Sequence, residues 1–421
     1  MKFLHAADIH LDSPLKGLDR YEGAPVEQFR SATRRALENL VASCLAEAVD
    51  FLLIVGDLYD GSWKDYRTGL FFAAQMSRLR AAGIPVFLIR GNHDAESNIT
   101  RSLRLPENVY EFSSERPETK RIEALGVALH GQSFAKRDVT DDLAARYPDG
   151  VPGAFNIGLL HTCASGREGH DSYAPCSLET LRSKGYDYWA LGHVHQREVL
   201  SESPWIVFPG NLQGRHAKET GAKGASLVTV ENGQVVRVEP RPYDVVRWAV
   251  WEIDLSSAPA PDQAIELVRE QLVRGMAEAD GRLLAARLVL VGATAAHSAL
   301  VGDPDKWSSE IRLAANDVGS ERLWIEKIEL ETRAAIDFTS LAERDDAIGQ
   351  LVQSLADLRK DRSALEALMS EVVADLKPKL LPELREGADG VRLDDPQFLA
   401  ALLDDVEQLL VPRLLEKERL P

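Results

Sequence analysis

Short apolar runs recur through the first 240 residues, and their spacing constrains the fold more than any other feature of the sequence. Two longer stretches, 26–48 and 67–82, lie between the first three runs and carry apolar residues at helical spacing. Uninterrupted apolar runs are typical of strands that are buried on both faces. Their alternation with helices predicts α/β layers with a largely parallel sheet. The expected strands are 2–7, 51–55, 85–89, 127–130, 156–160 and 186–191.

The pattern changes near residue 241, which indicates a second domain. Before this point we expect three further strands, at 206–208, 225–230 and 235–240, and Asn232-Gly233 predicts a hairpin between the last two. Beyond it the sequence predicts a small α/β unit. Its expected elements are a strand at 245–255, a helix at 263–277, and strands at 287–292 and 324–331.

A third part begins near residue 335 and is predicted to be helical. Leucine and valine recur at steps of three, four or seven residues over 351–380, which is typical of one face of a long amphipathic helix. That face either packs on its own domain or binds a partner, and the pattern leaves both interpretations open. We therefore expect three domains, at 1–240, 241–334 and 335–421.

Polar motifs occur at or just after the ends of the predicted strands. Carboxyl ends of parallel strands meet at one edge of a sheet, so their side chains can converge on one site. Within Asp-x-His and His-x-His, alternate residues of an extended segment point the same way. The motifs are Asp8-Ile9-His10, Gly56-Asp57, Gly91-Asn92-His93-Asp94, His161 and His193-Val194-His195, and the loop Pro209-Gly210-Asn211 follows them.

These motifs offer oxygen and imidazole ligands without sulfur, a set that suits Mn, Fe or Zn. Seven candidate ligands are too many for one tetrahedral ion, whereas two metals that share a carboxylate would use them all. Such a pair clamps a phosphate and lowers the pKa of a bound water towards ~7, which supplies a hydroxide nucleophile. The alternative is a degenerate site that no longer binds metal, but every ligand position is present. The seven are Asp8, His10, Asp57, Asn92, His161, His193 and His195.

The ordered motifs resemble the calcineurin-like metallophosphoesterase superfamily over residues 1–240. The segments 1–11 and 56–60 look like its DNA-repair exonuclease branch, which includes SbcD-like and YhaO-type proteins. The resemblance implies a four-layer α/β/β/α sandwich with a small α/β capping domain and a C-terminal helical segment. Runs similar to the YhaO type are 10–15, 166–170, 173–176 and 209–216.

The resemblance also implies roles for individual residues. Asp8, His10 and His195 would hold one metal. Asn92, His161 and His193 would hold the other, and Asp57 would bridge the two. His93 would lie beside the scissile phosphate as a catalytic residue. For Asp94 two interpretations stay open, a carboxylate that orients the His93 ring and a turn carboxylate, while Asp60 is interpreted as a cap after its strand.

Six further residues are candidates for substrate binding. Three of them follow His161 in a glycine-rich loop, and three form a basic run after the last ligand, where they would clamp a nucleic-acid backbone. For both sets the alternative is an ordinary solvated loop. The residues are Arg167, His170, Tyr173, Arg215, His216 and Lys218.

The leading functional hypothesis is a Mn-dependent exonuclease or endonuclease of DNA repair, in which a metal-activated hydroxide attacks DNA phosphodiesters. The family implies an SMC-like coiled-coil ATPase as a partner, and its members often form homodimers. A second hypothesis is a phosphoesterase that acts on small phosphodiesters or phosphomonoesters such as cyclic nucleotides. A third is a scaffold subunit with a vestigial site, against which the intact ligand set argues.

The formal charge of the 421-residue chain is −17, so its average surface should repel DNA. Metal ions or a DNA-binding partner would have to offset that repulsion. Three scattered cysteines argue against both a disulfide framework and a thiolate metal site. Charged residues near the start argue against a signal peptide, and no apolar run approaches the ~20 residues that a membrane span needs. These features predict a cytoplasmic protein without membrane contact.

Overall fold

The computed structural model describes residues 1–13, 23–60, 66–96, 104–164, 174–376, 379 and 395–418. The chain divides into two compact units. The first comprises Met1–Val250, Gly275–Ala286 and Glu321–Glu326, and the second comprises Trp251–Arg274, Arg287–Ser320 and Lys327–Pro421. The domain limits expected from the sequence, 1–240, 241–334 and 335–421, stay predictions. Among the described helices, none combines the length and the apolar composition that crossing a membrane requires.

The first six-stranded sheet has the order β12-β11-β1-β2-β3-β4. Its four strands from β1 to β4 are parallel. On the other side of β1, β11 runs antiparallel to β1, and the edge strand β12 runs antiparallel to β11. The helices α1 (Val26–Ala46) and α2 (Tyr66–Ala81) connect the first three strands. The strands are β1 (Lys2–Ala6), β2 (Phe51–Val55), β3 (Val86–Ile89), β4 (Val109–Glu111), β11 (Gly224–Glu231) and β12 (Gln234–Pro242).

The second six-stranded sheet has the order β5-β6-β7-β8-β10-β9. Its four central strands are parallel, and an antiparallel strand closes each edge. The strands are β5 (Glu118–Ile122), β6 (Val127–Gly131), β7 (Phe155–His161), β8 (Tyr188–Gly192), β9 (Glu198–Glu202) and β10 (Trp205–Phe208). The short helix α5 (Leu178–Ser183) precedes β8.

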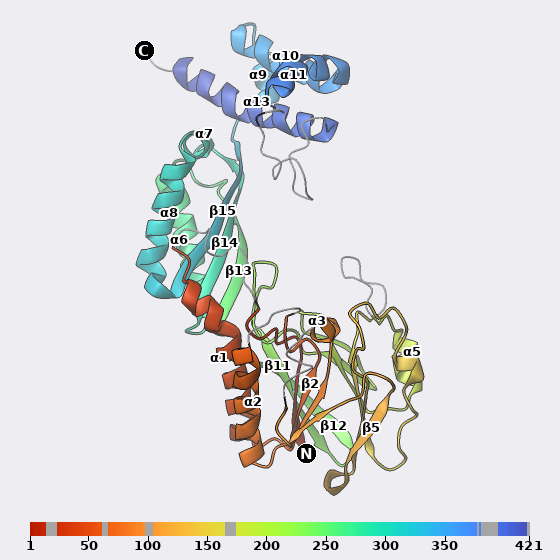
Figure 1. Cartoon of the computed structure of the whole chain (residues 1–421). Coiled ribbons are helices and arrows are strands. Elements are labelled where there is room, and N and C mark those ends of the chain that lie inside the picture. Colours follow the sequence, from red (N-terminus) through yellow and green to blue (C-terminus); the bar gives the residue numbers. More distant parts are fainter. Residues whose placement is uncertain are drawn as a thin grey trace. The chain divides into compact units, whose positions relative to one another are not determined.

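The two sheets pack face to face, with helices on the outer faces (Figure 1). Alternate residues of β1 point into two different cores. Phe3 packs in the core between the two sheets, whereas Leu4 packs in the core between the first sheet and helices α1 and α2. A third core lies on the far face of the second sheet and includes Leu181 of α5 and Trp189 of β8. This arrangement confirms the expected four-layer α/β/β/α sandwich.

Most of the expected strands and helices are found within a few residues of their expected limits, but β4, β5 and β9 were not expected. These three strands are short and half-exposed, and β5 alternates between half-buried and exposed residues. Each lies at or beside a sheet edge, where one face stays in contact with water. The search for uninterrupted apolar runs therefore missed them.

A separate three-stranded sheet has the order β13-β14-β15. It corresponds to the small α/β unit that the sequence predicted. Its strands are β13 (Val246–Asp254), β14 (Leu283–Thr294) and β15 (Leu323–Ala334), and its helices are α6 (Pro261–Glu278), α7 (His297–Gly302) and α8 (Pro304–Gly319). Val268 and Leu272 form the fully buried face of α6.

The long helix expected over 351–380 is two helices, α10 (Ala347–Lys360) and α11 (Arg362–Leu376). The chain breaks at Asp361, which is extended and whose carboxylate accepts a hydrogen bond from the Ala364 amide at 3.0 Å. Aspartate is often found at this position because its side chain accepts hydrogen bonds from the backbone amides at the start of a helix, which have no partner within the helix. Leu380 lies outside the described residues.

The apolar face of α10 is buried within its own unit. Val352 and Leu355 pack with Leu365 of α11 and with Leu399 and Leu403 of α13 (Pro396–Glu418). The short helix α9 (Phe338–Ala342) adds partly buried side chains to this core. Of the two interpretations of this face, packing on its own domain therefore holds for α10.

Candidate metal centre

The predicted ligands lie at the carboxyl ends of five strands drawn from both sheets. Asp8 and His10 follow β1, Asp57 follows β2, Asn92 follows β3, His161 ends β7, and His193 and His195 follow β8. Two glycines allow the strand ends to approach closely. A Cβ atom at Gly192 would clash with the backbone oxygen of Val55, and one at Gly56, whose φ is +83°, would clash with the His161 ring.

Four of these residues adopt the left-handed backbone conformation that non-glycine residues avoid. The φ angles are 51° at Asp8, 46° at His10, 51° at Asp57 and 100° at His193. Hydrogen bonds from backbone amides hold this geometry. The His10 amide donates to the main-chain carbonyl oxygen of Asp57 at 2.9 Å, and the His193 amide donates to the side-chain oxygen Oδ2 of Asp8 at 2.9 Å. Strained backbone of this kind, at about 1–3 kcal/mol per residue, clusters at functional sites.

The first group of ligand atoms comes from Asp8, His10 and His195. The Nε2 atoms of the two histidines lie 3.2 Å apart, and Asp8 Oδ1 lies 3.8 Å from His195 Nε2. His195 Nδ1 donates to Glu219 Oε1 at 2.6 Å, because a carboxylate can only accept. The lone pair of His195 therefore lies on Nε2, which faces His10.

The second group comes from Asp57, His161 and His193, with Asn92 beside it. His161 Nδ1 donates to the Val55 carbonyl at 3.1 Å, so Nε2 is the nitrogen that faces the rest of the group. That Nε2 atom lies 3.0 Å from Asn92 Oδ1 and 3.4 Å from Asp57 Oδ2. Asp57 Oδ2 also lies 3.9 Å from His10 Nε2, so this carboxylate lies between the two groups.

These donor sets fit divalent cations. In the first group the Nε2 atoms of His10 and His195 face each other at 3.2 Å, and a cation between them turns the repulsion of their lone pairs into attraction. In the second group one imidazole nitrogen and two oxygens face one another, which is also a donor set for such a cation. The buried Nδ1 atom of His10 makes no hydrogen bond within the described part of the chain. The second nitrogen of His195 and that of His161 are held by protein acceptors, as metal-binding histidines usually are.

The charges of the site also favour a cation. Burial raises the pKa of Asp8 to about 6, so ionising this carboxylate inside the protein needs a compensating positive charge. Burial alone would lower the pKa of His161, but the Asp57 carboxylate raises it to about 9. Asp57 itself keeps a lowered pKa against the effect of burial, mainly because His161 lies beside it.

His93 lies at the edge of this site and pairs with Asp60. The distance from His93 Nδ1 to Asp60 Oδ1 is 2.9 Å, and Ser13 donates a hydrogen bond to the other Asp60 oxygen at 2.5 Å. Burial alone would lower the pKa of His93, but the bond to Asp60 and the charge of Asp57 raise it. The side chain of His93 is one-third exposed, whereas that of His10 is fully buried.

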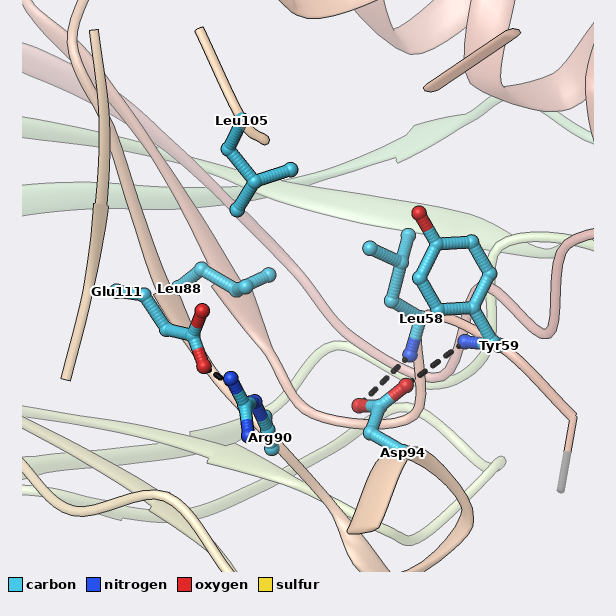
Figure 2. A pocket seen from close by; sticks show the side chains of 7 residues that line it. All are labelled: Leu58, Tyr59, Leu88, Arg90, Asp94, Leu105 and Glu111. Atoms are coloured by element: carbon cyan, nitrogen blue, oxygen red, sulfur yellow. Dashed lines mark hydrogen bonds and ion pairs between the residues drawn. The ribbon is translucent and has the colours of Figure 1, made fainter. Parts of the chain in front are cut away.

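Of the two interpretations of Asp94, its contacts fit the turn carboxylate. Its carboxylate accepts hydrogen bonds from the amides of Leu58 at 3.1 Å and Tyr59 at 2.9 Å (Figure 2). It also accepts one from the amide of Gly91 at 3.1 Å. It therefore ties the loop after β2 to the loop after β3. The orienting contact proposed for Asp94 at the His93 ring is made by Asp60 instead, which the sequence had suggested only as a cap.

Behind Asp94 lies a small pocket with largely apolar walls (Figure 2). An ion pair between Arg90 and Glu111 closes one side of it. Burial raises the pKa of Asp94 to about 7, and the nearby charge of Asp57 adds to this effect. The remaining lining residues are Leu58, Tyr59, Leu88 and Leu105.

The predicted substrate residues are only partly described. Arg167, His170 and Tyr173 lie outside the described residues. Arg215 lies between two carboxylates, with Nη1 at 3.7 Å from Asp60 Oδ2 and Nη2 at 3.4 Å from Glu219 Oε1. His216 and Lys218 are exposed to solvent.

Sequence reasoning missed two residues of the site, Asp60 in its contact with His93 and Glu219. Asp60 had a detectable signal, since it lies three residues after Asp57 in the same motif. Glu219 had none, because it approaches His195 only through the course of the loop between β10 and β11.

Comparison with known proteins places this geometry in a family. The model of the calcineurin-like phosphoesterases matches residues 1–197, and the model of the middle domain of metallophosphoesterase YhaO matches residues 248–333. The uncharacterized metallophosphoesterase YhaO of Bacillus subtilis is 35% identical over 376 residues, which cover 88% of this chain and 89% of that protein.

The match to YhaO, with the two family models, assigns the family, and two weaker similarities were also found. The DNA double-strand break repair protein Mre11 of Methanopyrus kandleri is 28% identical over 282 residues, which cover 59% of this chain and 58% of that protein. A crystal structure of a dimetal phosphatase from Danio rerio aligns with a TM-score of 0.34 and 13% identity, over 55% of this chain and 93% of that one. The chain therefore belongs to the calcineurin-like metallophosphoesterase family and is a metal-dependent phosphoester hydrolase.

Proposed function

We propose that this phosphoesterase is a two-metal nuclease that hydrolyses DNA phosphodiesters, as an exonuclease or an endonuclease. The observation that carries the proposal is the convergence of seven candidate ligands, three on either side of Asp57 and Asp57 itself, with His93 at the edge of the site. The repair function named for the Mre11 relative supports DNA as the substrate.

In this proposal Asp8, His10 and His195 would hold one cation, and Asn92, His161 and His193 would hold the other. Asp57, which lies between the two groups, would be shared by both cations. When bound, two divalent ions, for which we propose Mn with Fe or Zn as alternatives, supply Lewis acidity towards water and phosphate. The protein turns Nε2 of His161 and of His195 towards the side where the ions would bind. It does so by accepting the opposite protons at Val55 and Glu219.

We assign the proton transfer to His93. Its Nδ1 atom is held by Asp60, which leaves Nε2 to carry a proton to the leaving oxygen of the substrate. The raised pKa of His93 favours the protonated form of the ring. Asp94 contributes differently, because its three amide contacts fix the loop that carries Asp57 and Asp60.

We propose that DNA access and partner binding involve the rest of the chain, with 241–334 as a capping domain and 335–421 as a docking segment. An SMC-like ATPase is the proposed partner, and it would supply the DNA affinity that a chain of charge −17 lacks. Exposed apolar side chains at Leu368, Val406 and Leu410 are candidates for that contact. A homodimer is a further proposal, for which we assign no surface.

A second candidate function, hydrolysis of small phosphodiesters such as cyclic nucleotides, is favoured by one observation. The guanidinium of Arg215, which we expected to clamp a DNA backbone, already faces Asp60 and Glu219. Its charge is therefore largely compensated, and of the predicted basic run only His216 and Lys218 remain exposed. A small substrate would need no such clamp.

The decisive experiment compares the Mn-dependent cleavage of linear double-stranded DNA, single-stranded DNA and a chromogenic phosphodiester. Asn92→Ala and His93→Ala serve as controls for contaminating nucleases and should lose most activity on every substrate. Cleavage of either DNA by the wild type alone supports the nuclease. Cleavage restricted to the small diester would establish the second candidate in its place.

A further inference from the structure

Glu219 occupies an unusual position behind the first ligand group. Its side chain is 6% exposed, and its two oxygens face several donors at once. Oε1 accepts from His195 Nδ1 at 2.6 Å, while Oε2 accepts from Asn211 Nδ2 at 2.9 Å and from the Arg215 amide at 2.7 Å. A buried carboxylate that accepts so many hydrogen bonds is held in a single orientation.

The loop that carries Glu219 is itself attached to the residues that it serves. The Asn211 amide donates to the His195 carbonyl at 3.3 Å, and the Leu212 amide donates to the Asp8 carbonyl at 3.4 Å. Lys223, beyond the loop, donates to the same His195 carbonyl at 2.9 Å. Both the backbone and the ring of His195 are therefore positioned by residues 211–223.

Glu219 also connects the ligand group to the catalytic pair. Arg215 Nη2 lies 3.4 Å from Glu219 Oε1, and Arg215 Nη1 lies 3.7 Å from Asp60 Oδ2. Asp60 in turn contacts His93. A chain of contacts between alternating basic and acidic side chains thus runs from His195 through Glu219, Arg215 and Asp60 to His93.

We propose that Glu219 is a positioning residue. It fixes the His195 ring so that Nε2 faces the cation, and it holds Arg215 between itself and Asp60. The inference rests on the proposed two-metal function. A carboxylate behind a histidine ligand fixes the ring and strengthens the nitrogen as a ligand, and its loss usually costs roughly 10-fold to 100-fold in metal affinity.

The competing role is a purely structural one, in which Glu219 only holds its loop together. The two roles differ in one observable. A structural clamp affects the stability of the metal-free protein, whereas a positioning residue affects the binding of one of the two cations.

The test titrates MnCl2 into the metal-free full-length chain by isothermal titration calorimetry. Wild type should bind two equivalents. In Glu219→Ala one of the two should weaken by roughly 10-fold to 100-fold, and Glu219→Gln, which keeps one acceptor oxygen for His195, should lie between them. Glu407→Gln is a matched control, because Glu407 is also a buried glutamate paired with an arginine, Arg359, and should leave both affinities unchanged.

A double-mutant cycle separates the roles even if Glu219→Ala folds poorly. In a His195→Ala background, Glu219→Gln should leave the remaining Mn affinity unchanged, because its effect requires the His195 ring. Wild-type affinity for both equivalents in Glu219→Gln, or an equal loss in both backgrounds, would overturn the inference. A wild-type chain that binds no Mn would instead refute the proposed function.

Discussion

The Nδ1 atom of His93 lies 2.9 Å from Oδ1 of Asp60. Asp60 lies in the loop after β2, and His93 lies in the short helix α3 (Asn92–Glu96), which follows the neighbouring strand β3. The pairing has an electrostatic effect on the pKa of His93. The Asp60 carboxylate offsets the cost of charging the half-buried imidazole, so the pKa of His93 is raised although burial alone would lower it. The pairing with Asp60 thus favours the protonated form of His93 at the edge of the site.

We predict that Asp60→Asn lowers kcat by roughly 10-fold to 100-fold, less than the ~10²–10⁴-fold contribution of a general acid itself. The substitution removes the charge that raises the pKa of His93, so the fraction of protonated His93 falls at a lower pH. The alkaline limb of the kcat profile should move to lower pH. Rates on a chromogenic phosphodiester in Mn between about pH 5 and 9 measure this, and an unshifted limb would argue against His93 as the acid.

Metal content should depend on which ligand is removed. Asp57 lies between the two groups, so Asp57→Asn should weaken the binding of both cations, whereas His195→Ala should weaken the binding of only one. Metal analysis after dialysis against Mn gives the stoichiometries. Equal metal content in the two variants would contradict the bridging role of Asp57.

Mn should also stabilise the fold, because a ligand that binds only the native state shifts the unfolding equilibrium. At a free concentration 100 times Kd, each site should add about 2.7 kcal/mol to the free energy of unfolding. Denaturant titrations with Mn and with a chelator test this. His195→Ala should retain part of the increase, and a wild type that gains nothing would exclude tight binding.

Asp94→Asn should destabilise the protein by about 1–3 kcal/mol, which is the usual cost of a buried donor left without an acceptor. The asparagine amide can accept on one atom only, so at least one of the three amides at Leu58, Tyr59 and Gly91 loses its partner. Urea denaturation of the metal-free chain measures the loss. Asp60→Asn is the comparison and should cost less, because Asp60 is one-fifth exposed and binds side chains.

His5 predicts a separate dependence of stability on pH. The ring is fully buried, with Nε2–H donating to the Leu191 carbonyl at 3.1 Å and Nδ1 accepting from the Tyr188 hydroxyl at 3.0 Å. Burial lowers the pKa of His5 to about 3, so between its unfolded value of 6.5 and about 3 only the unfolded chain takes up the proton. Stability is therefore greatest above pH 6.5 and falls as the pH drops.

The slope that His5 contributes is ~1.4 kcal/mol per pH unit within that window. His5→Gln has no titrating ring, so its unfolding free energy should fall less steeply between pH 6 and pH 4. Urea unfolding of metal-free wild type and variant at several pH values gives both slopes. Parallel slopes would show that His5 is not neutral in the folded protein.

The sequence was most informative where side-chain burial repeats along the chain. Phe51 to Val55 form an entirely buried strand, and an uninterrupted apolar run has few other places in a folded protein. The ligand motifs could be located for the same reason, because they follow such runs. By contrast, β5 and β9 lie at edges, where alternating contact with water leaves no apolar run.

The break at Asp361 shows a further limit of periodicity. The leucine spacing continues through it, so the pattern predicts one helix, whereas the capping bond to Ala364 starts a second one. A capping contact needs only one residue and one amide. It therefore gives only a weak signal in the sequence, although in the structure it decides where one helix ends and the next begins.

By itself the sequence determined the layered α/β fold, the strand ends and the seven residues that could bind metal, since these follow from local residue pattern. Only the tertiary structure decided which carboxylate serves which histidine. Asp60 rather than Asp94 lies beside His93, and Glu219 reaches His195 across 24 residues of chain. Hydrogen bonds act over about 3 Å, and that proximity is set by how the loops pack rather than by their order in the sequence.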